Sequence, residues 1–170
     1  MRLEIRRAVI GDEGVLRDLR AQALTDAPEA FGSTLEREMA RTIEDWRKWM
    51  APGVTFLLLA ESEPRGLVAG VHDAREHAMV HLMAMWVHPG VRGSGAADLL
   101  VASVKEWARE VGAAEVRLNV VETNARARRC YERGGFRLTG RRGVVAKSCA
   151  AEIEMAWSAR GESASGTVGS

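Results

Sequence analysis

Apolar residues recur along this chain with two different spacings, which predict strands in some segments and helices in others. Residues 3–9 alternate between apolar and charged side chains, as a strand with one wet face does. Apolar residues three and four positions apart then predict a helix that begins at an Asp12 N-cap and ends near Pro28. Residues 34–50 are predicted to be helical in one or two pieces, which Pro52-Gly53 should end.

The rest of the chain alternates strands with single helices. Strands are predicted over 55–61, 66–75, 79–87 and 115–121, helices over 97–111 and 124–133, and a closing antiparallel pair over 136–142 and 149–157. Glu63-Pro64-Arg65 is predicted to be the hairpin turn of the first two of these strands. This order predicts an α/β (mixed α+β) fold with a twisted mixed sheet and helices on both faces. We expect one domain over 1–158 and a disordered tail over 159–170, which is rich in Gly, Ser and Ala.

Composition excludes several classes of protein. The net charge is +1, from 24 basic and 23 acidic residues, which argues against a dedicated nucleic-acid or membrane-surface protein. The two cysteines, Cys130 and Cys149, have no metal-ligand cluster around them, so no metal is expected. The charged N-terminus is unlike a signal peptide, and no apolar run reaches the roughly 18 residues of a membrane span. These features predict a cytoplasmic protein.

A turn of small residues joins one predicted strand to the following helix. It reads Arg92-Gly93-Ser94-Gly95-Ala96-Ala97 and follows Val87-His88-Pro89. The first backbone N–H groups of a helix lack intrahelical partners and attract anions, and small side chains let a diphosphate approach them. The spacing matches neither the dinucleotide fingerprint nor the P-loop. An ordinary strand–helix turn would look the same, so this motif alone leaves the choice open.

A second motif lies in the helix predicted over 124–133. Asn124, Ala127 and Tyr131 recur there at helical spacing, and Gly135-Phe136 follows. Together the two motifs resemble the Arg-x-x-Gly-x-Ala and Asn-x-x-Ala-x-x-x-Tyr blocks of the Gcn5-related N-acetyltransferase (GNAT) family. The resemblance covers roughly residues 2–157. It implies a GNAT-type sheet of about seven strands and acetyl-coenzyme A (acetyl-CoA) as co-substrate.

The resemblance also implies where that cofactor binds. The loop would hold the pyrophosphate, Asn124 would bond the pantetheine arm, and the fourth and fifth strands would splay to admit that arm. Within the fourth strand, Met83, Met85 and Trp86 could equally be core residues. The implied cofactor residues are Met85, Trp86, Val87, Arg92, Gly93, Ser94, Gly95, Ala96, Ala97, Asn124, Ala127 and Tyr131.

Acetyl transfer to an amine needs a base for the ammonium, a donor for the oxyanion that forms on the carbonyl and a hydrogen-bond donor for the leaving thiolate. A backbone N–H on the fourth strand, near Met85 to Val87, is the expected oxyanion donor. The resemblance to the GNAT family implies that Tyr131 is the acid. The residue pattern alone would make Tyr131 an amphipathic core residue. Several family members carry an acidic base six residues before the Val of Val-x-Pro, and His81 occupies that position here. Alternation places His81 on the same strand face as Met83, Met85 and Val87. A strand-edge histidine facing water is the alternative.

Other members use a Glu on the fifth strand as the base. Asn119 stands at the nearest position in this chain and cannot accept the proton, which rules out that scheme. His72, Asp73 and Glu122 are reserve candidates for the base. Cys130 should lie on another face of the helix from Tyr131, where we interpret it as buried and inert.

The acceptor is expected to be a small-molecule or peptide amine. The chain itself is expected to be able to form a homodimer. Phe31 and Gly32, in the loop after the first helix, and His72 are the predicted acceptor-binding residues, although Phe31 could also be a local anchor. The leading function is N-acetyl transfer from acetyl-CoA to a primary amine through a ternary complex. The alternatives are another acyl-CoA donor, or a non-catalytic acyl-CoA sensor or partner module.

Overall fold

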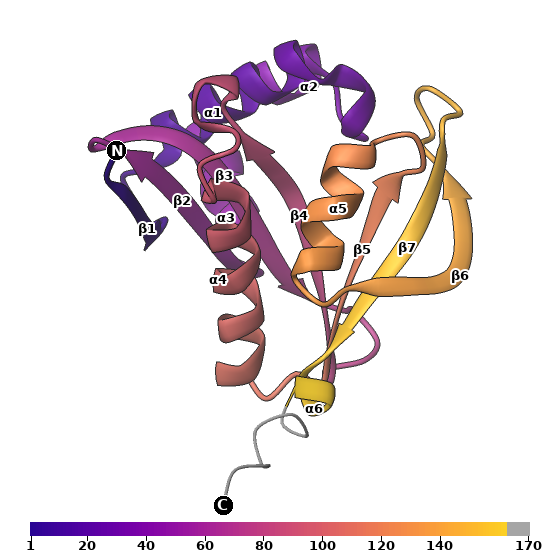
Figure 1. Cartoon of the computed structure of the whole chain (residues 1–170). Helices are drawn as coiled ribbons and strands as arrows, with labels where there is room; N and C mark the ends of the chain where they lie inside the picture. The colour runs from indigo at the N-terminus through magenta and orange to yellow at the C-terminus, as the bar shows by residue number, and fades with distance from the viewer. Residues whose placement is uncertain (163–170) are drawn as a thin grey trace, which may run out of the picture.

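The computed structural model describes residues 1–162, which form a seven-stranded sheet with helices on both faces (Figure 1). The sheet order is β1-β2-β3-β4-β5-β7-β6, and within it only β4 and β5 pair in parallel. The strands are β1 (Leu3–Arg7), β2 (Gly53–Ala60), β3 (Glu63–His72), β4 (Met79–Val87), β5 (Glu115–Val121), β6 (Arg137–Val144) and β7 (Ala151–Ser158). The helices are α1 (Glu13–Asp26), α2 (Leu35–Met39), α3 (Ile43–Met50), α4 (Ala96–Glu110), α5 (Ala125–Arg133) and α6 (Ala159–Glu162). The predicted mixed sheet with helices on both faces is confirmed.

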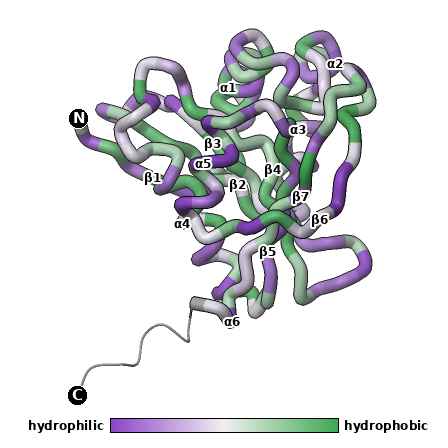
Figure 2. Tube along the Cα trace, turned by 45° about the vertical axis from the view of Figure 1, so that its right-hand side comes forward, coloured by the Kyte–Doolittle hydropathy of each residue, from purple (hydrophilic) through white to green (hydrophobic). Residues whose placement is uncertain are grey.

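Two apolar clusters lie on opposite faces of the sheet, whose central strands are largely hydrophobic in Figure 2. On one face α4 and α5 pack on the larger cluster, which includes Val68, Leu100 and Phe136. On the other face α1 and α3 bury Leu16 and Trp46 against the inner strands. Removing this apolar surface from water is the main stabilising contribution to the fold, and both clusters hold β4 between them.

Strands β4 and β5 separate partway along their length. Their ladder contains only Met79–Glu115, Val80–Val116 and His81–Arg117. Beyond His81 the two strands diverge, and α5 lies beside the opening (Figure 1). The backbone groups of β4 from Leu82 onward therefore have no strand partner on the β5 side, as the sequence resemblance implied.

A bulge in β4 corrects the predicted alternation of its side chains. Between the pairs Ala69–Met83 and Leu67–Trp86 the register shifts, and Ala84 adopts a positive φ of 57°. The extra residue reverses the facing pattern. His81 and Met83 lie on the α1–α3 face, whereas Met85 and Val87 pack in the α4–α5 cluster. The prediction that all four share one face was wrong, because simple alternation cannot anticipate a bulge.

Two other segments differ from the sequence-based expectation. The β2–β3 hairpin turns at Glu61 and Ser62, whose φ values are 49° and 71°, so the turn precedes the predicted Glu63-Pro64-Arg65. Positive φ at both turn residues matches the twist of a two-residue hairpin, and Pro64 lies beside a register shift that tolerates its missing N–H. At the C-terminus, Ala159–Glu162 form the short helix α6 where disorder was predicted. The rest of the predicted tail lies outside the described residues.

Candidate active site

The loop between β4 and α4 presents a row of unpartnered backbone donors. Within residues 1–162, the N–H groups of residues 93–97 have no hydrogen-bond acceptor. Gly93 and Gly95 have φ values of 79° and 87°, a left-handed conformation that favours glycine and turns these N–H groups toward one region. Gly95 is also the N-cap of α4, whose dipole adds partial positive charge. The loop therefore has the geometry of an anion site.

Arg92, at the start of this loop, is held by contacts within the protein. Its Nε donates to the Val87 carbonyl at 2.9 Å, and its Nη2 is paired with Asp26 at the end of α1. The indole of Trp86 also donates to Asp26, at 3.0 Å. Hydrogen bonds from Trp86 and then Arg92 hold the pKa of Asp26 below its usual range. This network fixes the loop against α1, so Arg92 is a positioned cation and not a mobile one.

Two adjoining cavities run from this loop into the opening between β4 and β5. The first, of about 420 Å³, is lined by the glycine loop and by Arg126, Arg129 and Arg133 of α5. The second, of about 190 Å³, is lined by β4, β5, α5 and Phe31. Arg133 is paired with Asp98, whereas Arg126 and Arg129 make no hydrogen bond or ion pair within residues 1–162. A polyanion with a narrow tail fits this shape and charge.

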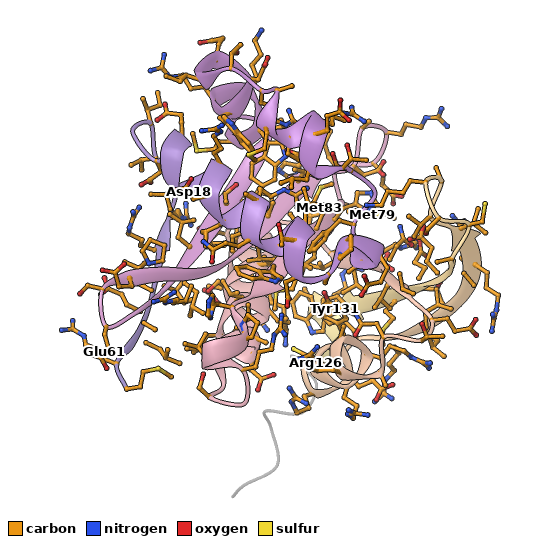
Figure 3. All side chains as sticks on the ribbon, turned by 90° about the horizontal axis from the view of Figure 1, so that it is seen from above. Asp18, Glu61, Met79, Met83, Arg126 and Tyr131 are labelled. Atoms are coloured by element: carbon orange, nitrogen blue, oxygen red, sulfur yellow. The ribbon has the colours of Figure 1, made fainter. Side chains whose placement is uncertain are left out.

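Helix α5 places Asn124 and Tyr131 on the wall of the narrower cavity. The Asn124 side chain accepts a hydrogen bond from the Ala127 N–H at 3.2 Å and so caps the N-terminus of α5. Tyr131 is only 6% exposed, and burial raises its pKa above the ordinary value, which keeps the phenol protonated. Its hydroxyl has no hydrogen-bond partner in the described part of the chain. Figure 3 labels Tyr131 with Arg126 on this helix and Met83 on β4.

Cys130 precedes Tyr131 and is buried, as the sequence indicated. Its exposed fraction is 5%, and burial together with the nearby charge of Asp98 raises the pKa of its thiol to about 11. A thiol with so high a pKa is a poor nucleophile at neutral pH, because the thiolate is the reactive form. Cys130 therefore contributes to packing beside the cavities.

His81 forms the last pair of the β4–β5 ladder, and its side chain lies on the α1–α3 face of β4. Its Nε2 is 2.7 Å from Oδ2 of Asp73, which follows β3, and its side chain is 34% exposed. The hydrogen bond from His81, with two backbone N–H groups, lowers the pKa of Asp73 to about 2. His81 does not line the narrower cavity, but Leu82 and Met83 directly after it do.

The three predicted acceptor residues are not brought together. Phe31 lines the narrower cavity, with the Arg20 guanidinium 5.2 Å from its ring centre. Gly32 is exposed between Phe31 and α2 and does not line the cavity. His72 lies on the opposite face of the sheet, where its ring packs 5.4 Å from that of Trp107. His72 does not line the narrower cavity.

Several site residues were missed from the sequence. Asp26 pairs with Arg92, and Arg20 lies over the ring of Phe31. Residue spacing along the chain does not reveal such tertiary contacts. Arg126 and Arg129 had a readable signal, because two arginines three apart on a helix beside an anion loop share one face. Among residues 1–162, no group of three or more His, Cys, Asp or Glu could hold a metal ion. In the same residues no helix is long and apolar enough to cross a membrane.

Known proteins with similar sequences include acetyltransferases. An N-acetyltransferase of Mycobacterium bovis is 35% identical over 88 residues, which cover 46% of this chain and 56% of that protein. A mycothiol acetyltransferase of Stackebrandtia nassauensis is 32% identical over 140 residues, covering 79% and 44%. The chain thus spans about half the length of the curated relatives it matches.

Solved structures share the fold at low sequence identity. A GNAT-family acetyltransferase of Streptococcus pneumoniae superposes with a TM-score of 0.77 and 18% identity, covering 92% of this chain and 99% of that one. An acetyltransferase of Salmonella typhimurium, solved with its cofactor acetyl-CoA, gives 0.76 and 16%, covering 93% and 94%. The profile of the acetyltransferase (GNAT) family matches residues 17–136. The chain therefore belongs to the GNAT family of acetyltransferases.

Proposed function

We propose that this protein transfers an acetyl group from acetyl-CoA to a primary amine by direct attack within a ternary complex. The observation that carries the proposal is the row of unpartnered N–H groups over residues 93–97, which opens into the gap between β4 and β5. A diphosphate would bind the N–H groups, and a pantetheine arm would enter the gap. There it could pair with the free backbone edge of β4, as an added strand does.

The residues around the gap supply the three groups that acetyl transfer needs. Backbone N–H groups near residues 85–87 would stabilise the oxyanion that forms on the carbonyl. Tyr131 would donate a hydrogen bond to the developing thiolate. Its raised pKa makes the phenol a weaker acid than the thiol of coenzyme A, so its role is to donate a hydrogen bond and not to transfer the proton. His81 would accept the amine proton through a water beside Met83.

The acceptor would enter from the α1–α3 side of the sheet. Phe31 forms one wall there, and the β6–β7 loop approaches from the other side, where Lys147 donates to the Ser33 carbonyl at 2.5 Å. The side chains of Met83 and Asn119 are exposed near this entrance. This mixture of apolar and amide surface suits a neutral or singly charged amine.

The direct test is a thiol-release assay with acetyl-CoA and a panel of amines that includes small amines, aminosugars and peptides with free N-termini. Amine-dependent release of coenzyme A, with a mass increase of one acetyl group on the acceptor, would support the proposal. Release from propionyl-CoA or succinyl-CoA alone would favour the alternative acyl donor. Tight acetyl-CoA binding without transfer to any amine would favour a sensor.

The charge of the wider cavity gives a further prediction. Replacing both Arg126 and Arg129 with Gln should raise the Kd of coenzyme A about tenfold, about 1.4 kcal/mol, because both side chains line the wider cavity and neither makes a hydrogen bond or a close ion pair in the described residues. Calorimetry at two salt concentrations should also show a shallower salt dependence for the variant. Figure 3 labels Arg126, which lines the wider cavity.

Arg137 and Arg141 provide the matched control for this charge change. Both lie on the exposed strand β6, away from the cavities, so replacing them with Gln removes the same charge elsewhere. The Kd of the control should stay within about twofold of wild type. Equal weakening by both double variants would mean that only net charge matters and that α5 has no phosphate contact.

A further inference from the structure

We propose that Asp73 positions His81 as the base of the reaction by fixing its ring so that Nδ1 is the nitrogen that accepts the amine proton. The inference rests on the proposed acetyl transfer and deepens it. It follows from the geometry of the β3–β4 turn, where Asp73 contacts the ring of His81.

The carboxylate of Asp73 is itself held rigidly. Its Oδ1 accepts hydrogen bonds from the N–H groups of Arg75 at 2.9 Å and Glu76 at 3.0 Å, while Oδ2 lies 2.7 Å from Nε2 of His81. The backbone N–H of Asp73 donates to the Met79 carbonyl at 3.0 Å, which closes the turn. One oxygen is thus fixed by the backbone, and the other is aimed at the imidazole.

This arrangement selects one tautomer of His81. An ionised carboxylate has no proton to donate, and the lowered pKa keeps Asp73 ionised at neutral pH. The short contact therefore requires that Nε2 carry the proton and donate it. The lone pair of the neutral ring is then on Nδ1, which makes no hydrogen bond within residues 1–162.

The charged side chain paired with His81 across the β4–β5 ladder is occupied elsewhere. Arg117, its neighbour across the β4–β5 ladder, binds Glu115 at 2.9 Å and Glu154 at 3.4 Å. On the β3 side its neighbour is Val71, which is apolar. The titratable and charged groups near the ring are Asp73, Arg75, Glu76 and His77 of the turn, Glu115 and Arg117 of β5, and Glu154 of β7. Of these, only Asp73 makes a hydrogen bond or ion pair with the ring in the described residues.

Asp73→Asn tests the proposal because it should reverse the tautomer. The amide oxygen would stay on the two backbone N–H groups, so the amide NH₂ would face Nε2 of His81 and require it to accept. In long-range ¹H–¹⁵N spectra of the neutral ring, wild type should show the proton on Nε2 and Asp73→Asn on Nδ1. With acetyl-CoA and the best amine, Asp73→Asn should lower kcat about tenfold or more and leave the KM for acetyl-CoA unchanged.

Three further variants separate positioning from structure. Glu76→Gln removes the same charge from the same turn without touching the ring, and should keep wild-type activity and tautomer. Asp73→Glu retains a carboxylate and should recover part of the rate. If Asp73 acts through His81, adding Asp73→Asn to His81→Ala should cause no further loss.

Each negative result has a distinct meaning. A proton on Nδ1 in wild type, or an additive loss in the double variant, would overturn the role of Asp73. An unchanged rate in His81→Ala would remove His81 as the base and this inference with it. Absence of transfer to every amine would contradict the proposed function, while the tautomer measurement would still decide how Asp73 orients the ring.

Discussion

Tyr131→Phe should lower kcat by about 100-fold or more, with little change in the KM for acetyl-CoA. The variant removes one oxygen from a residue that lines the narrow cavity, and that oxygen has no partner in the described part of the chain. In the proposed reaction the hydroxyl stabilises a thiolate that develops only in the transition state. Losing it should therefore slow the chemical step without weakening cofactor binding. Steady-state kinetics with saturating amine measure both quantities.

Protein stability provides the control for this variant. The Tyr131 ring packs 5.9 Å from that of Phe136, and phenylalanine would keep that contact. Because the hydroxyl has no protein partner to lose within residues 1–162, the free energy of unfolding should stay within about 0.5 kcal/mol of wild type. A kcat within a few-fold of wild type would reduce Tyr131 to a packing residue.

Gly95→Leu should raise the Kd of acetyl-CoA at least tenfold, or about 1.4 kcal/mol, in isothermal titration calorimetry. A Cβ at Gly95 meets no atom within 4 Å, so a leucine side chain would project into the open space beside the loop. We propose that the diphosphate occupies this space. The φ of 87° at Gly95 also disfavours any side chain, which would tend to turn the N–H groups away from their common region.

Gly112, at the other end of α4, allows backbone strain to be separated from the cofactor site. Its φ is 74°, and a Cβ there also meets nothing within 4 Å. Gly112→Leu should therefore lose about as much stability as Gly95→Leu, about 1–2 kcal/mol, and should bind acetyl-CoA with unchanged affinity. Unchanged affinity in a folded Gly95→Leu variant would contradict the assignment of this loop to the diphosphate.

The pH dependence of the reaction has a defined sign. Asp73, with its pKa lowered to about 2, stays ionised far below neutrality. An acidic limb of kcat/KM near neutral pH would therefore not report protonation of Asp73. His81→Ala should remove this acidic limb, and His81→Glu should restore part of the rate. An acidic limb that persists in His81→Ala would point to Glu122 or to an acceptor that binds as the free amine.

The elements with regular hydrophobic spacing could be predicted from the sequence, and so could the glycine loop. Gly93, Gly95 and Asn124 act through local backbone geometry, which the order of residue types encodes directly. The bulge at Ala84 could not be predicted in this way, because it depends on the pairing of β4 with β3. That single residue decides which face carries Met85.

The contacts made by site residues depended on the folded chain. Asp26 and Arg92 are far apart in sequence, and the Asp73–His81 contact requires the exact register of two strands. The prediction of His72 as an acceptor residue did not anticipate that the strand would direct it toward Trp107. The alternation of side chains within a strand can be predicted from the sequence. Which face of the strand lines the cavity depends on tertiary packing.

A crystal structure of this chain with bound acetyl-CoA tests the central claim most directly. We expect the diphosphate to contact the N–H groups of residues 93–97 and the pantetheine arm to lie between β4 and β5. The thioester sulfur should lie within hydrogen-bond reach of the Tyr131 hydroxyl. A cofactor bound outside the gap, or a thioester remote from both Tyr131 and Met83, would contradict it.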